Sequence, residues 1–163
     1  MNLDDLLQES GDRHLTAAER EQLQACARQL ELAARVAAAV EAAEPAVVED
    51  VVETLRERFP RFAELQPQAW ERLAADLQLV VRHDVRALIR GDPRSLDDSV
   101  LLYLRSILAA YRLSPGFVRE CFTRLREALK AKLGREEASA LDPYLKRNID
   151  VLSDLPEPAA AVV

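Results

Sequence analysis

The chain has 163 residues, of which 31% are charged and 5% aromatic, and it contains only four glycines. This length indicates one domain that can bury a core without disulfides, and the wealth of Ala, Leu, Glu and Arg predicts an all-α protein. The net charge of −6 argues against a nucleic-acid partner, because such proteins carry a basic surface. There is no run of 18 apolar residues and no signal-peptide core, so we expect a cytoplasmic protein without a membrane partner.

An amphipathic pattern opens the chain. Residues 2–9 place Leu3, Leu6 and Leu7 on one face, which is typical of a short helix. A helix of so few turns is unstable alone in water. We therefore expect it to dock on another surface.

A capping box marks the next helix. Thr16 and Glu19 have the spacing at which each side chain bonds the backbone amide of the other residue. They predict a helical stretch over 17–43, broken once along its length. Pro45 fits the first turn of a further helix that runs to about residue 59.

Two later helices have clear boundary signals. A helix over 67–90 ends at Gly91-Asp92-Pro93, because glycine favours the left-handed terminal conformation and proline cannot continue the helix. Ser114-Pro115 combines an N-cap with a proline in the first turn, and it predicts a helix to residue 133 that Gly134 closes.

The remaining segments have weaker boundary signals. Ser95 and Asp98 have capping-box spacing for a helix that ends near residue 111. After a short helical piece at 136–140, Asp142-Pro143 either caps a new helix to about residue 153 or kinks one continuous helix.

We predict one domain over residues 1–154. It would consist of an N-terminal helical extension (1–30) and a core (31–154), followed by a flexible Pro/Ala-rich tail at 155–163. The sequence shows no internal repeat and no strand pattern.

Several short motifs occur in the register of one known family. They are Leu15-Thr16-Ala17-Ala18-Glu19, Asp76-Leu77, Arg82, Gly91-Asp92, Arg105, Pro115, Glu136-Glu137-Ala138, Tyr144 and Ser153. In this order they resemble the phycobiliproteins, the light-harvesting subunits of cyanobacteria, over roughly residues 9–153. The resemblance implies a globin-like fold with two additional N-terminal helices.

The chromophore motif of that family is altered here. The family has Cys-x-Arg-Asp where this chain has Leu73-Ala74-Ala75-Asp76, so the cysteine that bonds the bilin and the arginine are both absent. A tyrosine that stacks near the pigment falls on Leu108 or Ala109, and Pro143 lies where the family has no proline. The chain is therefore not a covalently pigmented subunit at this site. It is most similar in kind to the bilin biosynthesis-associated globins, which accompany bilin reductases.

The helix over 67–90 carries the candidate pocket. At 100° per residue its apolar stripe contains Trp70, Leu73, Leu77, Val81 and Leu88, with Asp84 inside it, and its flank contains Asp76, Val80, His83 and Ala87. In a globin-like fold this helix walls the ligand pocket, so the resemblance implies that Asp76 and His83 border a tetrapyrrole.

Each side chain near this candidate pocket has two possible roles. A carboxylate at Asp76 can accept from two or three pyrrole N–H groups, or it can form a surface ion pair with Arg72. Arg72 can hold a propionate or be a solvated arginine beside Leu73. His83 can ligate haem iron, as the alternative to a bilin site, or be a half-exposed histidine. With only His14 besides it, a three-histidine metal site is excluded.

Asp84 needs a partner if it is buried, because a lone buried carboxylate is costly. Arg35 is the candidate that the sequence offers.

The opposite side of the same helix suggests an interface. It carries Leu79 between Arg82 and Arg86. In phycobiliproteins the arginine matching Arg82 pairs with an acid of a neighbouring subunit, which here corresponds to Glu9, with Asp12 nearby. The resemblance therefore implies a homodimer in which Leu3, Leu6 and Leu7 of each chain dock on the other. The alternative is docking of the first helix on its own domain.

No nucleophile–base constellation, phosphate loop or metal cluster occurs, so we expect no catalysis. The leading hypothesis is a bilin biosynthesis-associated globin that binds a tetrapyrrole non-covalently, or assists a bilin reductase or haem oxygenase. The alternatives are a pigment-free phycobiliprotein-like scaffold and a haem-binding sensor globin.

Overall fold

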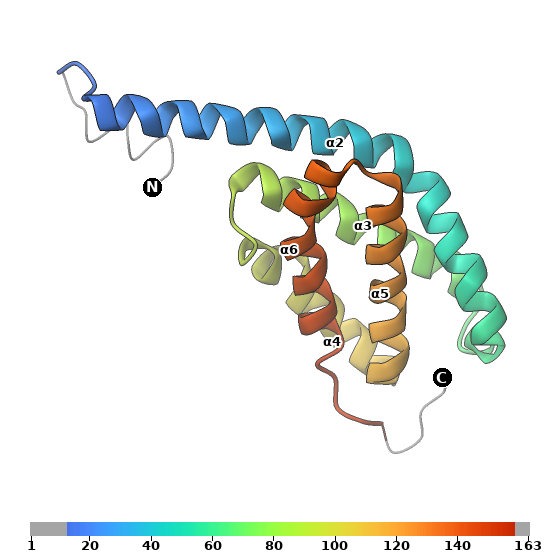
Figure 1. Cartoon of the computed structure of the whole chain (residues 1–163). Helices are drawn as coiled ribbons and strands as arrows, with labels where there is room; N and C mark the ends of the chain where they lie inside the picture. Colours follow the sequence, from blue (N-terminus) through green and yellow to red (C-terminus); the bar gives the residue numbers. More distant parts are fainter. Residues whose placement is uncertain (1–12, 159–163) are drawn as a thin grey trace.

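The structure, a computed structural model, describes residues 13–158 (Figure 1). The helices are α2 (Ala17–Arg58), α3 (Ala69–Arg90), α4 (Leu102–Ala110), α5 (Pro115–Lys132) and α6 (Arg135–Leu152), with a 3₁₀ helix η1 (Pro60–Glu64) and a π-helical turn η2 (Asp97–Leu101). The described residues contain no strand, so the predicted all-α class is confirmed. The predicted helix at residues 2–9 lies outside the described part.

Helix α2 is a single helix of 42 residues, so the predicted break before residue 43 and the separate helix from Pro45 are wrong. The capping box is confirmed, since Thr16 Oγ1 accepts from the Glu19 amide and Glu19 Oε2 accepts from the Thr16 amide. Pro45 and Glu41, whose carbonyl loses its helical donor, are both exposed, so water can bind that carbonyl. The helix continues through the proline and bends in this region (Figure 1).

Helix α3 ends as predicted. Gly91 has a φ of 71°, the left-handed conformation that glycine adopts without strain. The amides of Gly91 and Asp92 bond the carbonyls of Leu88 and Ala87 at 3.0 and 3.2 Å, which is the Schellman arrangement. The helix begins at Ala69, two residues later than the predicted start.

The two predicted serine caps have different outcomes. Ser114 Oγ accepts from the Phe117 amide at 3.1 Å, which confirms the start of α5. The capping box at Ser95 and Asp98 is wrong, because the Ser95 hydroxyl donates to the Asp92 carbonyl at 2.7 Å and the helical turns already include Ser95. The π-helical turn η2 then leads directly into α4.

Helix α6 is continuous, which decides between the two alternatives left open for Asp142-Pro143. Asp142 does not cap a helix. Its carboxylate instead binds Arg126 at 2.7 Å, Lys130 at 3.4 Å and Lys146 at 2.9 Å, and so joins α5 to α6. Pro143 is exposed, so the loss of its hydrogen bond is again on the solvent side of the helix.

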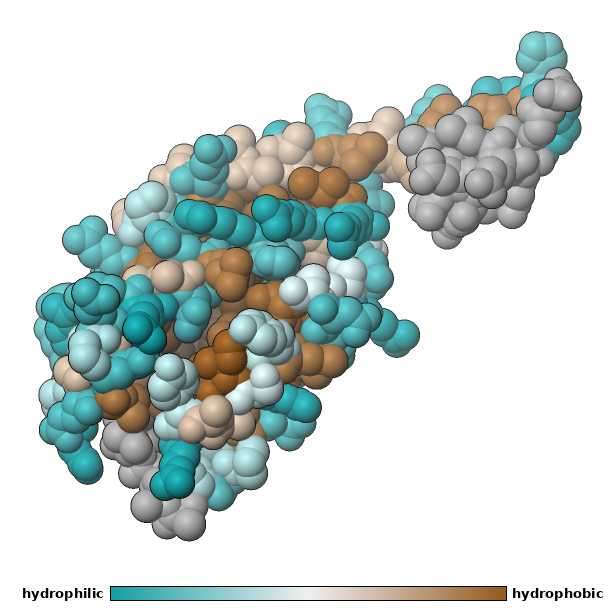
Figure 2. Space-filling view, turned by 180° about the vertical axis from the view of Figure 1, so that it is seen from behind, coloured by the Kyte–Doolittle hydropathy of each residue, from teal (hydrophilic) through white to brown (hydrophobic). Residues whose placement is uncertain are grey.

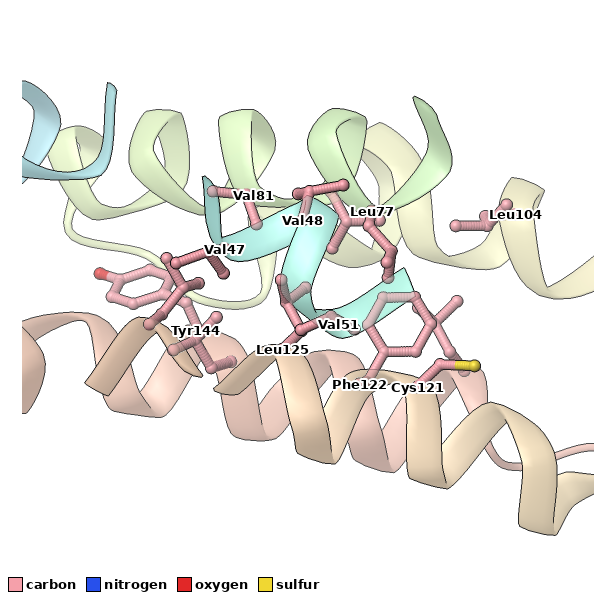
Figure 3. Close-up of a cluster of buried hydrophobic side chains, with 14 of the residues drawn as sticks. Val47, Val48, Val51, Leu77, Val81, Leu104, Cys121, Phe122, Leu125 and Tyr144 are labelled. Carbon is pink, nitrogen blue, oxygen red and sulfur yellow. The ribbon is translucent and has the colours of Figure 1, made fainter. Parts of the chain in front are cut away.

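The core lies between the second half of α2 and the helices α3, α5 and α6. Figure 3 shows valines of α2, Leu77 and Val81 of α3, and Phe122 and Leu125 of α5 converging on one apolar cluster. At one end an aromatic group joins η1, α3, α5 and Phe59, the residue that follows α2. The ring centroid of Phe117 lies 5.0 Å from that of Phe59 and 4.8 Å from that of Phe62, and the centroids of Phe62 and Trp70 are 4.6 Å apart.

The first half of α2 projects beyond this bundle (Figure 1). None of residues 17–32 is buried, and Ala33 is the first buried residue of the helix. The division into an extension (1–30), a core (31–154) and a tail (155–163) remains a prediction.

Candidate functional site

Helix α3 presents its three predicted faces as the periodicity indicated. The apolar stripe is buried, and the residues in it are Trp70, Leu73, Leu77, Val81, Asp84 and Leu88. On the flank, Val80 and Ala87 are buried whereas Asp76 and His83 are half-buried. Leu79, Arg82 and Arg86 are exposed on the opposite side. Asp76 and His83 therefore lie at the edge of the core, where a ligand against α3 would meet them.

Asp76 has no hydrogen-bond partner within residues 13–158. Partial burial raises the pKa of its carboxyl, and the Arg72 guanidinium one turn away partly offsets this effect. The alternative of a direct Asp76–Arg72 ion pair is wrong, because Arg72 donates to Gln66 Oε1 at 3.0 Å and makes no ion pair in the described chain. A half-buried carboxylate without a donor has free capacity for N–H groups.

Leu73 occupies the first position of the altered motif, one turn before Leu77. Its side chain is buried, with 7% exposure. An aliphatic side chain in the core can pack against a ligand but cannot form a thioether. Arg72 is exposed beside it, so its guanidinium is accessible from solvent.

His83 is half-buried and makes no hydrogen bond to another described residue. Burial lowers the pKa of its imidazole, and the nearby Arg86 and Arg90 guanidiniums lower it further, so the ring is neutral at pH 7. A neutral imidazole is the form that binds iron, and it is also the form expected of a histidine near an apolar core. Within residues 13–158, no group of three His, Cys, Asp or Glu side chains is placed to hold a metal ion.

Asp84 is fully buried, and the predicted partner Arg35 is wrong. Arg35 lies elsewhere, bound to Glu136 at 2.7 Å and Glu137 at 3.6 Å. The partner of Asp84 is Asn148 of α6, whose Nδ2 donates to Asp84 Oδ2 at 2.7 Å. Asp84 Oδ1 and Asn148 Oδ1 have no partner, and burial raises the pKa of Asp84 well above its usual value despite the amide.

Arg82 is engaged within its own chain. Its guanidinium donates to both carboxylate oxygens of Glu44 on α2, at 2.7 to 3.2 Å, and the Glu44 side chain is only 8% exposed. Arg82 is therefore already bound within its own chain and is not free to pair with Glu9 of a neighbouring subunit, as the resemblance implied. Glu9, Asp12 and the leucines of the first helix lie outside the described residues.

Neither Glu44 as the partner of Arg82 nor Asn148 as the partner of Asp84 was predicted from the sequence, although the pattern of apolar residues marks both. Glu44 falls in the stripe of Val36, Val40, Val47 and Val51, which are buried in α2. Asn148 falls in the stripe of Leu141, Tyr144, Leu145 and Leu152, which are buried in α6. A polar residue inside an apolar stripe requires a partner. Glu44, Asp84 and Asn148 are such residues; Asn148 pairs with Asp84, and Glu44 pairs with the exposed Arg82, both across helix contacts.

Large apolar side chains reach the surface outside this site. Figure 2 shows hydrophobic side chains in the middle of the face opposite that of Figure 1, surrounded by hydrophilic ones, and others along the projecting part of α2. The exposed large apolar residues are Leu30, Leu79, Ile89, Leu102, Tyr103 and Tyr111. Such surfaces mark docking sites for other molecules when they are contiguous.

Comparison with known proteins gives one result. A model of the phycobilisome protein family matches residues 8–152, a span that includes all five helices from α2 to α6. No curated protein sequence matches significantly. No helix in residues 13–158 is both long and apolar enough to cross a membrane.

Proposed function

Because this chain belongs to the phycobilisome protein family and has its all-helical, globin-like scaffold, we propose that it binds a tetrapyrrole non-covalently at α3 and acts in bilin biosynthesis. Members of this family are structural pigment carriers that typically bind bilins. The proposed role is likewise one of binding, in which the protein receives the substrate or product of a bilin reductase or haem oxygenase.

The half-buried Asp76 carboxylate carries the proposal. Asp76 is the one residue of the family's chromophore motif that this chain retains, and no described residue donates a hydrogen bond to its carboxylate. The pyrrole nitrogens of a linear tetrapyrrole are donors that converge on one side, so one carboxylate can accept two or three of them. Partial burial raises the pKa of the Asp76 carboxyl, and a ligand that supplies N–H donors would offset this cost of burying its charge.

Leu73 supports a non-covalent mode. Without a thiol at this position, retention of a pigment depends on packing and hydrogen bonds. Arg72 is exposed one residue away and can bind a propionate at the rim. Such a pigment would leave the protein on denaturation.

The test is an absorption spectrum of the full chain purified with and without a co-expressed haem oxygenase and bilin reductase. A red-absorbing pigment that acidic urea releases supports the proposal. A Soret band would instead identify haem, for which His83 is the candidate ligand. A colourless protein that also fails to bind added biliverdin would refute tetrapyrrole binding.

Asp76→Ala tests the role of the carboxylate. We expect it to weaken biliverdin binding by about 1.5–3 kcal/mol, the range of charge-assisted hydrogen bonds. Folding should change little, because alanine is a better helix former than aspartate. Asp50→Ala is the matched control, since Asp50 is an exposed helical carboxylate on α2. Equal affinities of the Asp76→Ala variant and the wild type would exclude Asp76 from the site.

We also propose that the chain forms a homodimer through the projecting part of α2 and the outer face of α3. Leu30 and Leu79 are 47% and 43% exposed, so both offer apolar surface to a second copy of the chain. The dimer would cover both surfaces by two-fold symmetry. Arg86 would pair with the acids of the first helix in place of Arg82, which Glu44 already binds.

Sedimentation at micromolar concentration tests the dimer. Deletion of residues 1–12 or Leu30→Glu should yield monomers, because the deletion removes the segment predicted to dock and the substitution places a charge in the proposed interface. Gln24→Glu is the control, since Gln24 lies on another side of α2 and is exposed. A wild-type monomer at high micromolar concentration would refute the interface.

A second candidate function is a pigment-free assembly protein. This function is favoured by the projecting half of α2, in which no residue is buried. Leu23, Cys26 and Leu30 recur there at helical spacing and so lie on one face that a partner could cover. This function predicts the dimer without any pigment, so the spectrum separates the two.

A further inference from the structure

A surface cavity of about 490 Å³ lies where η2, α4, α5 and the end of α6 meet. It contains no residue of α3 and is therefore separate from the site proposed above. Its volume is in the range of small-molecule sites. The charged groups around it are Asp97, Arg105, Arg119, Arg147, Asp150 and Asp154.

Two of these ionic contacts differ in strength. Arg147 holds Asp97 with two guanidinium nitrogens, and this pairing lowers the pKa of the Asp97 carboxyl. Arg105 and Asp154 make a single contact of 3.1 Å, and the Asp154 side chain is 79% exposed. An exposed single contact contributes little to stability. The Arg105–Asp154 contact is thus the one that an external group can replace.

Arg119 has no ion pair with any residue of the described chain. It extends from the second turn of α5 into the lining of the same cavity as Arg105. Asp97 and Asp150 lie within helical turns, whereas Asp154 follows the last turn of α6. The cavity lining therefore contains three arginines and three aspartates, and Asp154 is the aspartate that lies outside a helix.

We propose that this cavity binds the carboxylate or phosphate group of a small organic anion, held by Arg105 and Arg119 in place of Asp154. When the anionic group of the ligand takes the place of the Asp154 carboxylate at Arg105, the cavity lining still has one negative charge for each of its three arginines. Guanidinium groups match carboxylate and phosphate oxygens with paired hydrogen bonds. Leu102, which is 46% exposed, lines the same cavity and offers a surface to the apolar part of the ligand.

The experiment titrates the full chain with hexanoate, hexyl phosphate and inorganic phosphate, and follows the amide NMR shifts of residues that line the cavity. We expect saturable binding of at least one hexyl anion at about 1–10 mM, as small ligands of this size allow. Binding of hexanoate alone identifies a carboxylate site, and binding of hexyl phosphate alone identifies a phosphate site. Weaker binding of inorganic phosphate than of hexyl phosphate supports the apolar contact.

Two variants test the residues. Arg119→Gln should weaken binding about tenfold, the effect of one charge-assisted hydrogen bond. Asp154→Asn should tighten binding about two- to fivefold, because it removes the internal competitor. Arg28→Gln on the projecting part of α2 is the control and should bind as the wild type does.

No binding of any probe up to 50 mM, an unchanged affinity of Arg119→Gln, or weaker binding by Asp154→Asn would overturn the proposal. Circular dichroism of each variant excludes a folding defect as the cause. Asp154 follows the end of α6 and is exposed, so its substitution tests the site without altering the core.

Discussion

Substitution of the buried Asp84 by asparagine should stabilise the protein. Asp84 Oδ2 accepts from Asn148 at 2.7 Å, while Asp84 Oδ1 and Asn148 Oδ1 remain unpaired in the core. An amide at position 84 keeps the acceptor and adds a donor that can reach Asn148 Oδ1. This pairing contributes about 1 kcal/mol, the typical value of a net hydrogen bond, once the Asp84 carboxyl is ionised, whereas a protonated Asp84 can itself donate to Asn148 Oδ1.

The second contribution depends on pH. Burial raises the pKa of Asp84, so the folded protein retains a proton that the unfolded chain has released. The folded state binds more protons between the unfolded pKa, near 4, and the folded pKa, so stability falls as pH rises through this window. The fall is about 1.4 kcal/mol per pH unit. Asparagine does not titrate and removes this loss.

Urea unfolding of both proteins from pH 4 to 9, followed by fluorescence, measures the effect. Trp70 is the single tryptophan, and its indole is buried against Phe62, so its emission reports on unfolding. We expect the stabilities of the variant and the wild type to agree within about 1 kcal/mol at pH 4, and the variant to be more stable by about 2 kcal/mol or more at pH 8. Asp50→Asn, at an exposed position, is the control. A stability difference that does not grow with pH would refute a protonated Asp84.

Two further substitutions test the packing of α5. Asp142→Asn should destabilise by about 1–2 kcal/mol at pH 7, because three basic side chains of α5 and α6 hold this carboxylate and keep its pKa low. That contribution is lost as pH falls through the folded pKa, so urea unfolding at pH 3 should show a smaller difference; an equal loss at both pH values would contradict it. Phe117→Ala should cost about 3–5 kcal/mol in the same assay, since the ring contacts Phe59 and Phe62; a loss below 1 kcal/mol would mean that this aromatic group contributes little.

The boundaries that the sequence predicted correctly depend on local chemistry. Gly91-Asp92-Pro93 ends α3 because the left-handed conformation and the missing proline donor act within one turn. Thr16 and Ser114 cap α2 and α5 for the same kind of reason. The buried stripe of α3 was also predictable, since periodicity depends on helix geometry alone.

The errors come from interactions that local sequence does not contain. Pro45 was predicted to start a helix, and a new helix at Pro143 was one of two alternatives, but both prolines lie on exposed sides of helices whose packing is continuous on the other side. Core contacts on that side outweigh one lost hydrogen bond. Ser95 lost its predicted role for a related reason, since the helical turns begin before the residue that its spacing would cap.

Two carboxylates on α3, Asp76 and Asp84, show why side-chain roles were harder to predict than the fold. They lie two turns apart on adjacent faces, and the sequence suggested an arginine as a possible partner for each, Arg72 for Asp76 and Arg35 for Asp84. Asp84 points at α6, where Asn148 satisfies one oxygen, so it serves the core. Asp76 lies at the edge of the core and accepts nothing from the described chain. The role of a carboxylate on α3 therefore depends on whether it lies on the face packed against α6 or at the edge of the core. Asp76, at the edge, is available to a ligand and is the residue to test with a tetrapyrrole.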